Sequence, residues 1–217
     1  KEGFCSVIME GRGIPAKGAF PSNFTYGNDA VETVSYDPEE AKKLLEESGW
    51  TDTDGDGYVD KDGQKLTINW LTYPTRLEQP KLAEYAQATL KEIGIDVSVN
   101  NTSDHRTYAE NGEFDVYVSS LTTAPTGDPE YFFSSTVTGS KNYGNYQNDE
   151  VTKLTEQLHQ TFDTDERGKL AVELQQKILD DDAYFFVSHL NMGIVTKANV
   201  TGIAAHPCDY YEITADL

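Results

Sequence analysis

Long apolar runs are absent from this sequence. No stretch of about 18 or more apolar residues occurs, so no segment has the composition of a membrane-spanning helix. The opening residues, KEGFCSVIMEGRG, also lack the charged leader, apolar core and small-residue cleavage site of a signal peptide. We therefore expect the chain to be an excised part of a longer polypeptide.

Basic residues are few relative to acidic ones. The chain has 17 Lys and Arg against 37 Asp and Glu, a formal net charge of -20. Such a field repels phosphate backbones at long range, so we expect no nucleic-acid partner. We expect these carboxylates to lie mainly on solvated helix faces.

Cysteine is almost absent. Cys5 and Cys208 have no CxxC spacing, which excludes the common zinc and thioredoxin patterns. A disulfide between them and two buried free thiols both remain open, because sequence alone does not show whether the two sulfurs meet.

Catalytic motifs are absent as well. The sequence has no Walker loop, no GxGxxG, no GxSxG and no HExxH, and its four histidines are scattered (His105, His159, His189, His206). Carboxylates are too numerous for any one pair to be informative. We therefore expect no enzyme and no required cofactor, with an acid-pair hydrolase as the enzymatic alternative.

Strands and helices alternate in the middle of the chain. Strands are predicted over 66–72, 95–101 and 114–119, and helices lie between them from about Pro80 to Ile93 and over 106–110. An earlier helix begins at Asp37, with Pro38 in its first turn and Glu40 completing a capping box. This alternation predicts an α/β fold with a mixed, largely parallel sheet flanked by helices.

The later part of the chain predicts a helical hairpin over about 151–162 and 163–178, followed by strands at 184–189 and 193–196 that return to the sheet. Between the third strand and this hairpin, residues 121–149 read as irregular. We expect this segment to be a binding loop, with aromatic side chains as pocket walls or core (Tyr131, Phe132, Phe133, Tyr143, Tyr146).

An Asp-rich segment, DTDGDGYVD, matches positions 1 to 9 of a calcium-loop template. Its positions 1, 3, 5, 7 and 9 are Asp52, Asp54, Asp56, Tyr58 and Asp60. The bidentate Glu of position 12 is replaced by Gly63. A structural Ca²⁺ site and a plain Asp-Gly turn are both consistent with this pattern. A calcium-stabilised extracellular structural module is therefore a further functional alternative.

Several phrases together resemble the peptide and nickel family of ABC-transporter solute-binding proteins. They are YDPEEAKKLLEESGWTDTDGDGYVDKDGQKLTINWLTYPTR, LAEYAQATLKEIGIDVSVN, GEFDVYVSSLTTAPTGDPEYFF, NYGNYQNDEV and HPCDYYEITADL. The resemblance covers nearly the whole chain. It implies one lobe of a type II periplasmic-binding-protein fold, divided into an irregular crossover segment (1–35), a carboxyl-terminal ligand-binding lobe (36–204) and a return segment toward the hinge (205–217).

The resemblance also implies a function. Such a protein binds a peptide or peptide-like solute between two lobes and delivers it to an ABC permease, outside the cell or in the periplasm, held by a lipid anchor on an amino terminus that this chain lacks. The missing amino-terminal lobe is then a partner, and the chain alone is expected to bind solute poorly because half the cleft is absent.

Carried over by motif, the pocket wall runs from Leu121 to Asp128. The expected ligand contacts are Thr122, Thr123, Thr126 and Tyr143. Where oligopeptide receptors carry an Asp for the peptide amine, this sequence has Pro125. A nickel or metallophore chelate is the alternative solute, although the metal-contacting His of the nickel receptors falls near Lys141 here.

Overall fold

The computed structural model describes residues 1–203 of the 217-residue chain. The chain folds into two compact units. The central unit is Val34–Ser120, and the split unit joins Lys1–Thr33 to the chain from Leu121 onward. This division follows contacts within the chain, whereas the predicted division at residues 35 and 204 concerns the architecture of a longer protein and stays a prediction.

The central unit is built on a parallel sheet of three strands, β4 (Thr67–Thr72), β5 (Asp96–Asn101) and β6 (Val116–Tyr117), in the order β5-β4-β6. Trp70 of β4 pairs with Val99 on one side and Val116 on the other. The predicted parallel sheet is confirmed, although β6 is shorter than the strand predicted over 114–119.

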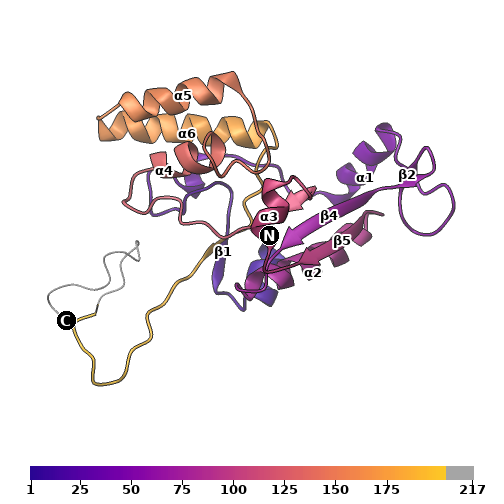
Figure 1. Ribbon diagram of the computed structural model, residues 1–217, viewed down its shortest axis with the longest axis horizontal. Coiled ribbons are helices and arrows are strands. Elements are labelled where there is room, and N and C mark those ends of the chain that lie inside the picture. The colour runs from indigo at the N-terminus through magenta and orange to yellow at the C-terminus, as the bar shows by residue number, and fades with distance from the viewer. Residues whose placement is uncertain (204–217) are drawn as a thin grey trace. The chain divides into compact units, whose positions relative to one another are not determined.

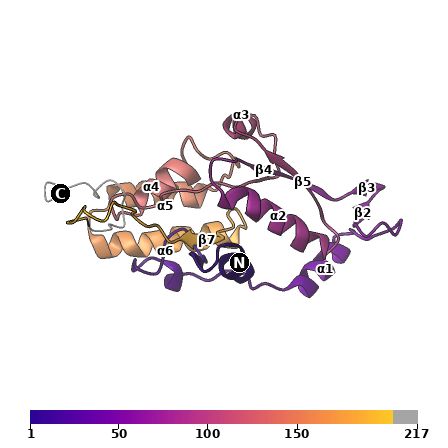
Figure 2. The same cartoon turned by 90° about the horizontal axis from the view of Figure 1, so that it is seen from below.

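Helices of the central unit are α1 (Pro38–Glu47), α2 (Glu78–Lys91) and α3 (His105–Glu110). The Asp37 side chain accepts a hydrogen bond from the Glu40 N–H at 3.0 Å, as the capping pattern predicted. The helices α2 and α3 lie on opposite sides of the sheet (Figures 1 and 2). A short hairpin, β2 (Asp60–Lys61) with β3 (Gln64–Lys65), follows the Asp-rich segment.

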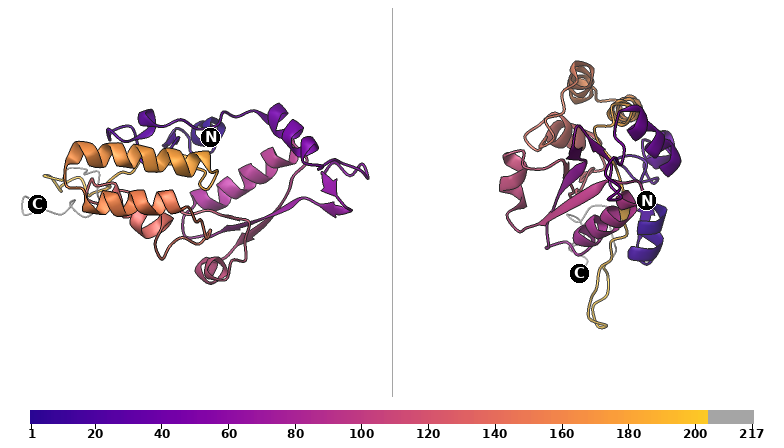
Figure 3. Two further views of the ribbon diagram at one scale, coloured as in Figure 1. Left: turned by 90° about the horizontal axis from the view of Figure 1, so that it is seen from above. Right: turned by 90° about the vertical axis from the view of Figure 1, so that its right-hand side faces the viewer.

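The split unit centres on two long helices, α5 (Asp149–Gln160) and α6 (Thr164–Asp180), which run side by side as the predicted hairpin (Figure 3). The shorter elements around them are η1 (Phe4–Ile8), β1 (Gly13–Pro15), η2 (Asn28–Ala30), α4 (Glu130–Phe132), η3 (Phe133–Val137) and β7 (Ser188–Leu190). Apolar side chains from both long helices join a core that includes Phe20, Phe132, Phe133, Leu158 and Leu174.

Two expectations about this unit were wrong. Of the two strands expected here, the structure has the end of the first as β7, which pairs antiparallel with β1 and does not join the parallel sheet, and residues 193–196 form no strand. Tyr184 and Phe186 pack against the aromatic core instead. The lead-in of this unit is mostly irregular, with the short elements η1, β1 and η2 and fully buried side chains such as Phe20 and Val31.

Among the described residues, no helix combines the length and the apolar character that crossing a bilayer requires. Cys5 is buried in η1. His206 and Cys208 lie outside the described residues, as does the predicted return segment, so the pairing of the two cysteines stays a prediction.

Candidate functional site

The segment Leu121–Asp128, here called the threonine segment, opens the second part of the split unit. Thr122 and Thr126 are exposed, so their hydroxyls can reach a solute. Thr123 is half-buried and faces the protein, because its Oγ1 donates to the Ala19 carbonyl at 2.9 Å. The structure thus places two of the predicted contacts at the surface and gives the third an anchoring role.

Tyr26 fixes the far end of this segment. Its hydroxyl donates to the Gly127 carbonyl at 2.6 Å, and its ring lies edge-on to Phe20 with 4.9 Å between centroids. Burial, reinforced by the nearby Asp128 carboxylate, raises the pKa of Tyr26 to about 12. The phenol therefore stays protonated and able to donate at neutral pH.

Arg167, in the first turns of α6, holds the carboxylate that ends the segment. Its Nε donates to Asp128 Oδ2 at 2.8 Å, and its Nη2 donates to Oδ1 at 2.6 Å. Burial acts to raise the pKa of Asp128, but the hydrogen bonds from Arg167 and the Glu130 N–H outweigh it and the pKa is lowered. Asp128 is therefore an ionised, bidentate partner of Arg167.

Gln175 supports the chain behind the segment. This side chain is fully buried, accepts from the Ala19 N–H at 3.0 Å and donates to the Tyr26 carbonyl at 2.7 Å. Ala19 and Tyr26 are the residues whose carbonyl and hydroxyl meet the threonine segment. A continuous set of hydrogen bonds therefore runs from α6 to the predicted ligand wall.

The aromatic residues between 130 and 148 divide between core and surface. Phe132 and Phe133 are core side chains, and Tyr131 is exposed beside the Lys141 ammonium, which donates to its hydroxyl at 3.0 Å. Tyr143, the fourth predicted contact, is half-buried in a separate segment after η3. Its role as a ligand contact stays a prediction.

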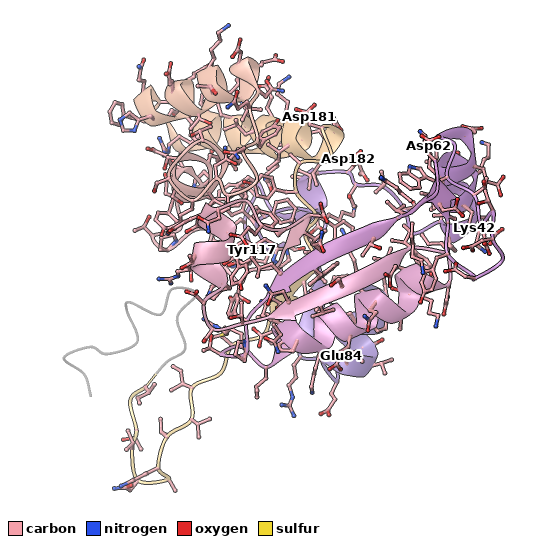
Figure 4. The ribbon with its side chains drawn as sticks, turned by 45° about the vertical axis from the view of Figure 1, so that its right-hand side comes forward. Lys42, Asp62, Glu84, Tyr117, Asp181 and Asp182 are labelled. Atoms are coloured by element: carbon pink, nitrogen blue, oxygen red, sulfur yellow. The ribbon has the colours of Figure 1, made fainter. Side chains whose placement is uncertain are left out.

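Tyr146 is held at the end of α6. Its hydroxyl donates to Asp181 Oδ2 at 2.6 Å, and Asn148 Nδ2 donates to the same oxygen at 2.7 Å. These two bonds lower the pKa of Asp181, which Figure 4 labels where α6 ends. The arrangement is a structural tie between the start of α5 and the end of α6.

Two hollows in the described part of the chain involve other residues. One, of about 220 Å³, is lined by residues of α4, η3 and α5, among them Glu130 and His159. The other, of about 490 Å³, lies on the sheet face of the central unit and includes Asn69, Asn100 and Tyr108. Both are shallow, so neither encloses a small solute by itself.

The Asp-rich segment is exposed, and three of its carboxylates approach one another. One oxygen from each of Asp52, Asp54 and Asp60 lies within 4.8 Å of the others. Asp56 turns to Lys65, with 2.7 Å between Oδ2 and Nζ, and the same ammonium lies 4.2 Å from the ring centroid of Tyr58. The acidic side chains also accept hydrogen bonds from their own loop, so a calcium ion there stays a prediction.

The three histidines in the described part of the chain each contact another side chain, and His105 has the most extensive contacts. Its ring stacks on Tyr73 at 4.1 Å, and its Nδ1 lies 2.7 Å from the hydroxyl of Tyr117, labelled in Figure 4. Burial lowers the pKa of His105. His159 contacts Glu130 at 2.7 Å and His189 contacts Asn28 at 3.2 Å. Each of these three imidazoles therefore has a structural partner.

Sequence reasoning missed Arg167, Tyr26 and Gln175, the residues that fix the shape of the predicted ligand wall. Arg167 stands 39 positions from Asp128 along the chain, and Tyr26 stands 101 from Gly127. No local spacing signals such a contact. An alternating pattern or a cap can be read within a few residues, whereas these pairs exist only after the chain has folded.

The parallel sheet with flanking helices is the architecture of type II periplasmic binding proteins. Residues 1–144 match the family described as bacterial extracellular solute-binding proteins, family 5 Middle. The chain belongs to this family. Proteins of the family are extracellular solute-binding proteins, and the solved relatives below share the fold.

Two curated relatives are similar along nearly all of the chain. The oligopeptide-binding protein AppA of Bacillus subtilis (strain 168) is 31% identical over 225 residues, which cover 98% of this chain and 41% of the relative. The nickel-binding periplasmic protein of Escherichia coli (strain K12) is 28% identical over 197 residues, which cover 87% and 37%. The chain thus spans about two fifths of the length of these relatives.

Solved structures of peptide-binding and nickel-transport proteins are similar to this chain as well. The structure of AppA from Bacillus subtilis in complex with a nonapeptide superposes with a TM-score of 0.73 at 28% identity, over 87% of this chain and 39% of that one. The nickel ABC transporter protein of Bacillus halodurans gives a TM-score of 0.75 at 29% identity, over 86% and 39%. The predicted fold class and family are confirmed.

Proposed function

We propose that the chain forms one wall of the solute site in the binding component of an ABC importer. The complete protein captures a peptide or peptide-like solute between two lobes and hands it, chemically unchanged, to the permease. It works at the extracellular face of the membrane or in the periplasm. The other wall of the site belongs to an amino-terminal lobe outside this chain.

One observation carries this proposal. The threonine segment presents the exposed hydroxyls of Thr122 and Thr126 on a backbone held by three separate side-chain contacts, from Thr123, Tyr26 and Arg167. A preformed wall lowers the ordering cost of binding. Exposed hydroxyls and backbone groups suit the amides of a peptide-like solute, because both partners donate and accept hydrogen bonds.

A nickel or metallophore chelate is the second candidate, since several relatives carry nickel in their names. Lys141 argues against direct ligation of a metal by this wall. It stands near the position where the family resemblance places the metal-contacting His, its ammonium lies beside Tyr131, and an ammonium has no lone pair for a metal ion. A chelate wrapped in its own organic ligand is still compatible with the segment.

The test uses the full-length protein purified from its native host. Mass spectrometry of retained solute, followed by calorimetric titration with peptides and with nickel chelates, should find saturable binding of a peptide-like compound. The same solute should be recovered intact after incubation. Recovery of hydrolysed solute would contradict the transport role and favour the acid-pair hydrolase. Binding of nickel chelates alone would favour the second candidate.

A further inference from the structure

Charge is nearly absent from the predicted ligand wall. Of the residues in the threonine segment, Asp128 alone carries an ionisable side chain. A cationic group of a solute would seek this carboxylate as its counter-charge, because charge-assisted hydrogen bonds are about twice as strong as neutral ones. Whether Asp128 is available therefore decides which part of a solute the wall prefers.

Arg167 already occupies this carboxylate. All five of its N–H donors are used: Asp128 takes two in the bidentate pair, Glu130 Oε2 takes one at 2.9 Å, and the carbonyls of Leu158 and Thr161 take the remaining two at 2.6 Å each. The Arg167 side chain is only 14% exposed. The guanidinium is thus fixed between the end of α5 and the threonine segment, with no donor left to exchange.

Breaking this pair to bind a solute cation is unfavourable. The Arg167 charge would remain in a largely buried position with its strongest partner lost, and removing one partner of such a pair costs far more than the pair contributes. Lys could not replace Arg167, since an ammonium has three donors and no planar fork.

We propose that Arg167 is a positioning residue that shapes the threonine segment and withholds the Asp128 carboxylate, so that this wall selects neutral polar groups of a solute over cationic ones. This inference rests on the proposed function and adds a rule of selectivity to it. Arg167 itself does not touch the solute. The rule predicts that the wall gains affinity for a solute with a cationic group when the Arg167 guanidinium is removed.

The experiment titrates the full-length protein by calorimetry with two probes, pentaalanine with a free amino terminus and its N-acetylated form. In the Arg167→Met variant the affinity ratio, free amine over acetylated, should rise on the order of ten-fold relative to wild type, because a released carboxylate gains a charge-assisted bond. In the double variant Arg167→Met, Asp128→Asn the ratio should return to the wild-type value. An unchanged ratio in Arg167→Met would overturn the selectivity rule.

A second readout does not depend on the peptides. Amide hydrogen exchange over residues 121–128 should be at least several-fold faster in Arg167→Met than in wild type, with the middle of α5 and α6 unchanged. Lys169→Met is the matched control, because Lys169 lies on the same helix, is exposed and forms an ion pair with Glu166. It should change neither readout. Equal exchange in Arg167→Met and Lys169→Met would refute the positioning role.

Two further variants separate the possible failures. If Arg167→Met does not fold, Asp128→Asn alone should give faster exchange over 121–128 without any gain for the free amine. If wild type binds neither peptide, the peptide assignment fails, and the exchange measurement still decides whether Arg167 positions the segment.

Discussion

At the scale of single residues, two neighbours on α6 make the same kind of contact in different surroundings. Gln175 is fully buried and joins the Ala19 N–H to the Tyr26 carbonyl. Gln176 bonds the N–H and the carbonyl of Glu32 in the same manner, but water reaches that site. Loss of a buried partner leaves backbone groups unsatisfied, whereas water replaces a partner at the surface.

This contrast predicts the effect of two matched substitutions. Gln175→Leu should lower the free energy of unfolding by about 2 kcal/mol or more, since it orphans a buried donor and a buried acceptor. Gln176→Leu should change it by less than about 0.5 kcal/mol. Urea denaturation of both variants gives the comparison. Equal effects would show that Gln175 is not the buried bridge described.

His189 predicts a dependence of stability on pH. Burial, with a contribution from the Lys1 charge, lowers the pKa of His189 to about 4 in the folded state, against 6.5 for a free imidazole. Between these values the unfolded chain binds more protons than the folded one, so stability is full above about pH 6.5 and falls as the pH drops toward 4.

The corresponding experiment compares wild type with His189→Gln. From pH 7 to pH 5 the wild type should lose about 1–2 kcal/mol more unfolding free energy than the variant, which has no imidazole to protonate. Denaturation curves at the two pH values measure this difference. Parallel losses in the two proteins would rule out His189 as the source.

The residues that shape the candidate wall were the hardest to predict from sequence. Arg167 sits in DTDERGKL, where an arginine after acidic residues is typical of an exposed helix face. Its partner Asp128 belongs to another segment. Thr123 likewise could not be told from Thr122 and Thr126, since which hydroxyl turns inward depends on the position of Ala19.

At the scale of elements, local signals were reliable and long-range ones were not. The capped helix at Asp37 and the hairpin of α5 and α6 could be predicted because caps and apolar spacing lie within a few residues. Of the strand expected at 184–189 only its end forms, as β7, because the aromatic run YFFV before it is equally suited to a core of rings. Tertiary packing decided whether this run became a strand or part of the aromatic core.

The cap of α6 gives an element-scale prediction. Asp163 accepts hydrogen bonds from the N–H groups of Asp165 and Glu166. Asp163→Ala should destabilise the protein by about 1 kcal/mol. Asp165→Ala, which removes an exposed carboxylate without removing the cap, should cost only a few tenths of a kcal/mol. Thermal unfolding compares them, and equal midpoints would contradict the assignment of Asp163 as the cap.

The Asp-rich segment before β2 gives a second prediction at this scale. If Asp52, Asp54 and Asp60 hold calcium, a few millimolar Ca²⁺ should raise the melting temperature of the full-length protein relative to a chelator, because an ion that binds only the folded state stabilises it. Asp54→Asn should reduce this shift. Identical melting curves with calcium and with chelator would remove the ion from the account.

At the scale of the whole molecule, the family and fold could be recognised from sequence, whereas the solute could not. The order of motifs covers nearly the entire chain, so the α/β architecture followed. Solute identity depends on a few contacts at the edge of a wall, and relatives with similar folds carry names of peptide and nickel binders alike. Chemistry at the threonine segment, rather than the fold, must distinguish them.

The most direct test of the account is calorimetric titration of the full-length protein with the solute identified by mass spectrometry, comparing wild type with Thr122→Val, Thr126→Val. The double variant should bind on the order of ten-fold more weakly, since two hydroxyl contacts are lost. Thr152→Val, exposed on α5, is the control and should bind normally. Wild-type affinity in the double variant would contradict the claim that the threonine segment forms the solute wall.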